Sequence, residues 1–201
     1  DNSMESLEKA IEHGDASFEI EVRQRPNGTI VMSNDIINTN SDGTEITAAF
    51  QRVKETDMHL NLDIRETRVL KNLHDLIVDY SLTDRVTLTG IEVFQANKVK
   101  ENCPGVEYYV NYMPSRINIF TEDYQQKIID MLEKTGAIGI NCNYKYASRT
   151  LSNLLHKNGY KLSIWTVDRK YQIKRALVNT ADNITTHNPQ KVQHIINKWG
   201  K

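Results

Sequence analysis

This chain has few cysteines, no long apolar run and almost no net charge. Cys103 and Cys142 are too few for a disulfide framework, and their spacing fits no metal-binding motif. No apolar segment approaches the length of a transmembrane helix. A net charge of −1 produces no global field that would recruit nucleic acid or an anionic membrane surface. We therefore expect no nucleic-acid partner and no membrane span in this chain.

The remaining composition is that of an ordinary globular protein. The 201 residues are 39% hydrophobic and 25% charged, which suits one domain with a sizeable core. There is no low-complexity linker, and the composition does not shift along the chain. The sequence therefore predicts a single domain over residues 1–201.

One expected strand, in residues 18–23, carries two carboxylates on the same face. In FEIEVR, apolar side chains alternate with Glu19, Glu21 and Arg23. Neighbouring carboxylates on one face are unfavourable, and a bound cation or a cluster of cationic groups would remove that cost. A turn at 26–28 then returns the chain toward Asn34. This pattern indicates either an ion site or a charged edge strand.

A second expected strand, HLNLDIRE at residues 59–66, alternates in the same way. Its leucines and isoleucine point to one side, while Asn61, Asp63 and Arg65 point to the other. The chain therefore has a second strand with an acid at its centre.

Strands and helices alternate throughout, with a period of roughly 25 to 30 residues that is typical of repeated βα units. Expected strands cover 18–23, 29–33, 59–66, 86–89, 106–110, 137–140, 161–167 and 183–185, with 36–44 as a polar loop. The first expected helix ends at about residue 13. The other expected helices cover 46–55, 69–80, 92–102, 123–135, 148–158, 171–179 and 189–198. An open doubly wound sheet and a closed barrel both fit this order. Polar groups at the ends of several strands, and the lack of a Gly-rich dinucleotide motif, favour a (β/α)₈ TIM barrel. We count seven barrel strands, so a closed barrel needs an eighth before Asp1.

The motifs, in order, resemble those of the glycerophosphodiester phosphodiesterase family, a group of TIM barrels similar to phosphatidylinositol phospholipase C. Residues 1–3 resemble the family's Glu-Asn-Thr, and SLEKAIEHGDASFEIEV is similar to its helix, Gly turn and Glu-x-Asp strand. RPNGTIVMSND resembles its hairpin returning to His-Asp, and LNLDIRE resembles its Glu-Ile-Lys strand. GYKLSIWTVD and ADNITTHNP resemble its last two strands.

The resemblance implies a site for one divalent cation, Mg²⁺ or Ca²⁺, with Glu19, Glu21 and Asp63 as ligands. Such cations prefer hard oxygen ligands. Arg65 takes the place of the family's Lys and would hold a phosphate oxygen. Trp165 matches the aromatic that lines the glycerol pocket. Alternatively, Arg65 pairs with Asp63 and Glu21 and replaces the metal ion.

This sequence departs from the family's pattern at the residues that transfer protons. The family's two catalytic groups are histidines; the opening His-Arg-Gly strand is not in this sequence, and Asn34 replaces the other histidine. Asn cannot carry a proton at neutral pH, and losing such a group costs about 10² to 10⁴ in rate. His187, in TTHNP, is a candidate replacement, or a loop residue before the last helix.

The resemblance thus implies a metal-dependent hydrolase that converts a small glycerophosphodiester into glycerol phosphate and an alcohol, with reduced or lost activity. The alternative is an inactive relative that binds a phosphodiester or serves as an interaction domain.

Overall fold

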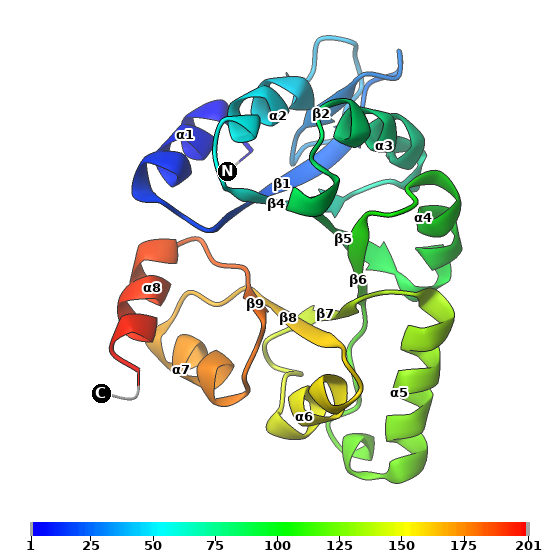
Figure 1. Cartoon of the computed structure of the whole chain (residues 1–201), viewed down its shortest axis with the longest axis vertical. Helices are drawn as coiled ribbons and strands as arrows, with labels where there is room; N and C mark the ends of the chain where they lie inside the picture. The colour runs from blue at the N-terminus through cyan, green and yellow to red at the C-terminus, as the bar shows by residue number, and fades with distance from the viewer. Residues whose placement is uncertain (1, 200–201) are drawn as a thin grey trace. The chain divides into compact units, whose positions relative to one another are not determined.

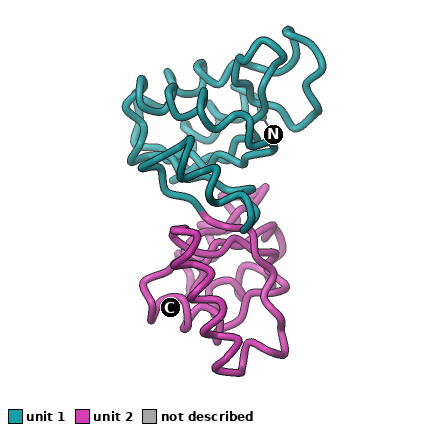
Figure 2. Tube along the Cα trace, turned by 90° about the vertical axis from the view of Figure 1, so that its right-hand side faces the viewer, with its two compact units in different colours: residues 1–108 teal, residues 109–201 magenta. Residues whose placement is uncertain are grey.

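A computed structural model describes residues 2–199 of the chain; Asp1, which belongs to the first motif of the resemblance, lies outside the described residues. The chain packs into two compact units, residues 1–108 and residues 109–201 (Figure 2). We describe each unit by itself. None of the described helices combines the length and the apolar character that a membrane span requires.

The first unit is a parallel α/β layer that ends in an antiparallel hairpin (Figure 1). Its helices are α1 (Met4–His13), α2 (Ile46–Lys54), α3 (Leu70–Asp79) and α4 (Ala96–Asn102), with short 3₁₀ turns at Thr67–Val69, Thr83–Arg85 and Val93–Gln95. Its strands are β1 (Ser17–Gln24), β2 (Ile30–Met32), β3 (Thr44–Glu45), β4 (His59–Ile64) and β5 (Val86–Glu92). Strand β1 pairs with β4, and β4 with β5, in parallel, while β2 pairs antiparallel with β1.

Local sequence explains where α1 begins and ends. Ser3 is the N-cap, and its hydroxyl accepts a hydrogen bond from the backbone N–H of Ser6 at 3.1 Å. Gly14 ends the helix in the left-handed conformation at φ 71°, which costs glycine little. The buried side chains of α1 are Leu7 and Ala10. The helix therefore contributes one apolar face to the core.

The core of the first unit lies on the apolar faces of β1 and β4. Ile20, Val22, Leu60 and Leu62 are fully buried, and burial of such a side chain contributes about 1.5–3 kcal/mol. The alternating polar residues of both strands consequently share the opposite face. The parallel register places Glu19 beside Asn61 and Glu21 beside Asp63.

The second unit is also parallel α/β. It contains most of β6 (Glu107–Asn111), then β7 (Gly139–Asn143), β8 (Lys161–Trp165) and β9 (Asn183–Ile184). Its helices are α5 (Glu122–Thr135), α6 (Arg149–Lys157), α7 (Lys170–Val178) and α8 (Pro189–Asn197), with a 3₁₀ turn at Asn118–Phe120. Strands β6 to β9 pair in sequence order and in parallel.

The predicted α/β class is confirmed, and the described residues contain the seven predicted strands outside the hairpin, β1 and β4 to β9. Several expected boundaries differ from the observed ones; the strand expected over 161–167, for example, ends at Trp165. Thr44, expected in a polar loop, begins β3 because it pairs with Met32 of β2. The strand expected over 86–89 continues to Glu92, and Gly90 lies within it at φ +73°, which glycine adopts at little cost.

Both cysteines lie in the core, and we predict that neither reacts readily in the native protein. Cys103 and Cys142 are buried, and burial raises the pKa of each thiol from 9.0 to about 12. The thiolate is the reactive form, so its fraction at pH 8 falls roughly a thousandfold. Above the ordinary thiol pKa the unfolded chain loses these protons first, and native stability therefore decreases as pH rises through about 9 to 12.

The measurement is the reaction of the native protein with a disulfide reagent at pH 8, beside the same protein in denaturant. Two slow thiols that become fast on denaturation are expected. A thiol that reacts equally fast in both states would contradict the prediction.

Candidate functional site

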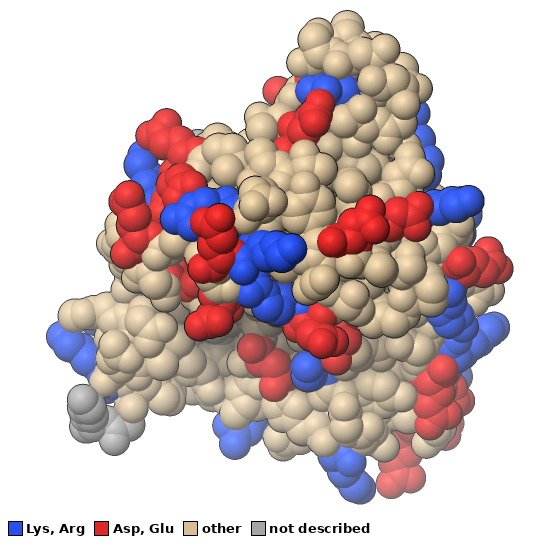
Figure 3. Space-filling model, turned by 45° about the horizontal axis from the view of Figure 1, so that its top comes forward, with Lys and Arg blue, Asp and Glu red and all other residues tan. Residues whose placement is uncertain are grey.

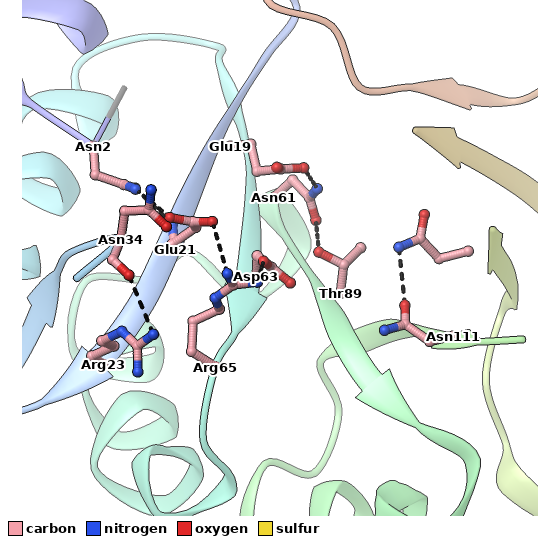
Figure 4. A network of polar contacts seen from close by, with 11 residues as sticks. Asn2, Glu19, Glu21, Arg23, Asn34, Asn61, Asp63, Arg65, Thr89 and Asn111 are labelled. Atoms are coloured by element: carbon pink, nitrogen blue, oxygen red, sulfur yellow. Dashed lines mark hydrogen bonds and ion pairs between the residues drawn. The ribbon is translucent and has the colours of Figure 1, made fainter. Parts of the chain in front are cut away.

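The polar face of β1 and β4 brings the predicted site residues of the first unit together (Figure 4). Glu19 accepts a hydrogen bond from the side-chain amide of Asn61 at 2.6 Å. The carbonyl oxygen of that amide accepts one from the buried hydroxyl of Thr89, on β5, at 3.0 Å. A continuous polar row therefore crosses three neighbouring parallel strands and fixes the position of Glu19.

Arg65 lies between the two other predicted acids. Its Nη1 is 3.0 Å from Oδ2 of Asp63, and its Nη2 is 3.3 Å from Oε1 of Glu21. The side chains of Asp63 and Glu21 are 16% and 21% exposed, and that of Arg65 is 38% exposed. Burial raises the pKa of the Asp63 carboxyl above its ordinary value, and the Arg65 guanidinium acts in the opposite direction. The site is thus half-sheltered, with a cation already in contact with both carboxylates.

Asn2 holds Glu21 from the start of the chain. Its amide nitrogen donates to Oε2 of Glu21 at 2.9 Å, and its carbonyl oxygen accepts the Glu21 backbone N–H at 2.7 Å. The sequence analysis did not assign Asn2 to the site, although the motif at residues 1–3 was the available signal. The contact orients one carboxylate while leaving its other oxygen to Arg65.

Asn34 and Arg23 complete the cluster. Nη2 of Arg23 donates to the backbone carbonyl of Asn34 at 3.2 Å, and Asn34 itself is exposed. The Nε of Arg23 is buried and has no hydrogen-bond partner among the described residues. Arg23 was read as one residue of an alternating strand. Its position on β1, two residues after Glu21, adds a second guanidinium to the polar face of that strand.

The three predicted metal ligands do not fit a divalent cation in the arrangement found. Among residues 2–199, no three His, Cys, Asp or Glu side chains come together closely enough to hold a metal ion. Glu19 is bonded to Asn61, whereas Glu21 and Asp63 are joined by Arg65. The predicted Mg²⁺ or Ca²⁺ therefore stays a prediction. The alternative arrangement, in which Arg65 pairs with Asp63 and Glu21, is the one found in the structure.

In the second unit, His187 follows β9 and is held by Asp168. Nδ1 of His187 is 2.9 Å from Oδ2 of Asp168, and the His187 backbone N–H donates to Oδ1 at 2.8 Å. The Thr186 hydroxyl donates to the same Oδ1 at 3.0 Å. Burial alone would raise the pKa of Asp168, but the hydrogen bonds from His187 and Thr186 lower it below its ordinary value. Asp168 therefore orients the imidazole.

The sequence analysis did not assign Asp168, which is the last residue of WTVD. Trp165 is the last residue of β8 and is half-buried. Its carbonyl oxygen accepts the Tyr144 N–H at 2.9 Å. Its predicted role beside a glycerol group stays a prediction.

Charges of both signs are interspersed on the face of the molecule shown in Figure 3. That distribution agrees with the net charge of −1. Neither sign of charge forms an extended patch on this face.

Comparisons with known proteins place this geometry in a known fold. No family model matches the chain. A glycerophosphodiester phosphodiesterase from Caldanaerobacter subterraneus subsp. tengcongensis is 24% identical over 156 residues, which are 75% of this chain and 60% of that protein. The chain therefore spans about 60% of the length of this curated relative.

Solved structures agree over nearly the whole chain. A glycerophosphodiester phosphodiesterase from Parabacteroides distasonis has a TM-score of 0.80 and 18% identity, covering 100% of this chain and 91% of that one. The chain has the fold of the glycerophosphodiester phosphodiesterases. The enzyme of that name from Thermotoga maritima gives a TM-score of 0.68 and 18% identity, covering 98% of this chain and 92% of that one. The predicted TIM-barrel class is therefore confirmed at the level of fold.

A third solved structure contains a ligand. An Oleispira antarctica phosphodiesterase, in complex with the product sn-glycerol-3-phosphate, has a TM-score of 0.76 and 16% identity. It covers 98% of this chain and 91% of that one. The resemblance to glycerophosphodiester phosphodiesterases inferred from sequence motifs is thus confirmed by one curated relative and by several structures.

Proposed function

We propose that this chain binds glycerophosphodiesters and hydrolyses them to glycerol phosphate and an alcohol, at a rate reduced by Asn34. The observation that carries the proposal is the cluster of Glu19, Glu21, Asp63 and Arg65, on and directly after the neighbouring parallel strands β1 and β4. A guanidinium beside two acids offers charge-assisted donors to a phosphate oxygen. The Oleispira antarctica phosphodiesterase, with its bound glycerol phosphate, supports the choice of ligand class.

The proposed reaction needs two proton transfers. The glycerol 2-hydroxyl attacks phosphorus and gives its proton to a base, and the leaving alkoxide takes a proton from an acid. The resulting cyclic phosphate is then opened by water. We assign phosphate binding to Arg65. In the second unit, Asp168 orients His187 through Nδ1, and the roles of His187 in proton transfer and of Trp165 beside the glycerol group stay predictions from the sequence resemblance.

A second candidate function is binding without hydrolysis. Asn34 favours it, because an amide cannot exchange a proton near neutral pH. In that case the same row of charges would hold a phosphodiester, or the chain would act as an interaction domain. Direct measurement of turnover separates the two candidates.

The test is release of glycerol phosphate from glycerophosphocholine, with and without added Mg²⁺ or Ca²⁺. We expect slow turnover in the parent and a fall of about 10² in His187→Gln, because the oriented imidazole is lost. His156→Gln is the matched control, since His156 also pairs with an aspartate, Asp182, at 2.8 Å. Turnover absent from the parent would support binding alone, and equal rates in His187→Gln and the parent would remove His187 from the mechanism.

A further inference from the structure

Two carboxylates of the first unit share one guanidinium. Glu21 and Asp63 are register partners on β1 and β4, so their side chains emerge beside each other. Arg65, two residues after Asp63, contacts Oε1 of Glu21 at 3.3 Å and Oδ2 of Asp63 at 3.0 Å. Without a cation this pair would repel. The chain itself supplies the cation, because Arg65 contacts both acids.

Arg23 brings a second positive charge to the same face. It lies two residues after Glu21 on β1, and its Nη2 donates to the backbone carbonyl of Asn34 at 3.2 Å. Glu19, the third acid on this face, is hydrogen-bonded to Asn61 at 2.6 Å, so Arg65 is shared by Glu21 and Asp63. A divalent cation must displace Arg65 to reach the carboxylate oxygens that the guanidinium contacts.

We infer that Arg65 replaces the divalent cation in this chain, and that the site holds a phosphate anion through guanidinium groups without a metal ion. A guanidinium has five N–H donors in a planar fork, and the contacts with Glu21 and Asp63 leave donors of Arg65 for a further acceptor. The side chain is 38% exposed, so an anion reaches it from solvent. The phosphate class of the ligand rests on the proposed function, whereas the replacement of the cation does not.

The inference predicts a gain of metal binding when the guanidinium is removed. Arg65→Gln leaves Glu21 and Asp63 as an unneutralised pair of hard oxygen ligands. Arg65→Lys keeps a positive charge there and should behave like the parent. Arg68→Gln is the matched control, because Arg68 is a nearby arginine paired with another acid, Glu66, at 2.9 Å.

The first experiment is thermal unfolding after dialysis against chelator, with and without Ca²⁺ or Mg²⁺. The melting temperature of the parent, Arg65→Lys and Arg68→Gln should not change, whereas saturating cation should raise that of Arg65→Gln by about 5 °C. A parent that is stabilised by Ca²⁺ or Mg²⁺ would overturn the inference. So would an Arg65→Gln variant that folds and does not respond to either cation.

The second experiment uses inorganic phosphate as the probe, in the presence of chelator. Phosphate should bind the parent in calorimetry, and its affinity should fall at least tenfold in Arg65→Gln and stay unchanged in Arg68→Gln. Phosphate binding that requires added metal would overturn the inference. A parent that binds phosphate without metal but does not hydrolyse glycerophosphocholine would reject the proposed hydrolysis and leave this inference standing.

Discussion

Asn34→His is expected to raise the rate of glycerophosphocholine hydrolysis by about 10² to 10⁴. Asn34 follows the hairpin strand β2, at the position where the resembled motif has a histidine. An imidazole takes and gives protons near neutral pH, which an amide does not. Asn34 is exposed, and Arg23 contacts its backbone carbonyl, so a larger side chain at this position keeps that hydrogen bond and extends into solvent.

The measurement is initial rate against pH for the parent, Asn34→His and Asp35→His. Asp35 is the next residue and is also exposed, so Asp35→His adds the same imidazole at a neighbouring position. Only Asn34→His should gain activity, and its rate should depend on pH between about 5 and 8. An equal gain in Asp35→His would show a nonspecific effect of histidine and would reject the assigned role of position 34.

Gly90→Ala is expected to lower the free energy of unfolding by about 3 kcal/mol or more. A Cβ at Gly90 would lie 2.3 Å from Oδ1 of Asp63, and 2.7 Å and 2.9 Å from the backbone O and N of Ile64. The residue also has φ +73°, which an L side chain rarely adopts. The substitution therefore strains β5 and pushes Asp63 away from Arg65.

Gly105→Ala is the matched control because it separates steric overlap from backbone strain. Gly105 has a similar φ of +80°, but a Cβ there meets nothing within 4 Å. Its substitution should cost only about 1 kcal/mol, from the left-handed backbone alone. Chemical denaturation of both variants measures the difference. Equal losses would mean that the close approach of Gly90 to Asp63 does not constrain the fold.

The arrangement of elements could be predicted because it follows from local periodicity. Alternation in residues 18–23 and 59–66 placed the acids and Arg65 on shared strand faces, and the structure has β1 and β4 there in parallel register. The end of the first helix was predicted at about residue 13, and Gly14 ends α1 in the structure. The order of motifs was enough to predict the TIM-barrel class, which similar structures confirm.

Partners of the polar side chains could not be predicted in the same way. Asn2 reaches Glu21 across 19 residues, and Asn61 reaches Glu19 across 42. Such contacts depend on strand register and on the packing of distant segments, and periodicity carries no information about either. The sequence left open whether Arg65 would face a metal ion or the acids, and it gave no reason to pair Asp168 with His187.

By itself, the sequence determined which faces carry the acids and Arg65, because side-chain direction alternates along any strand. Only the tertiary structure decided what neutralises those acids. Glu21 and Asp63 are 42 positions apart in the chain and meet through the register of β1 and β4, which brings both within contact distance of one guanidinium. Electrostatic energy depends on separations in space, and those separations arise only when the strands pair.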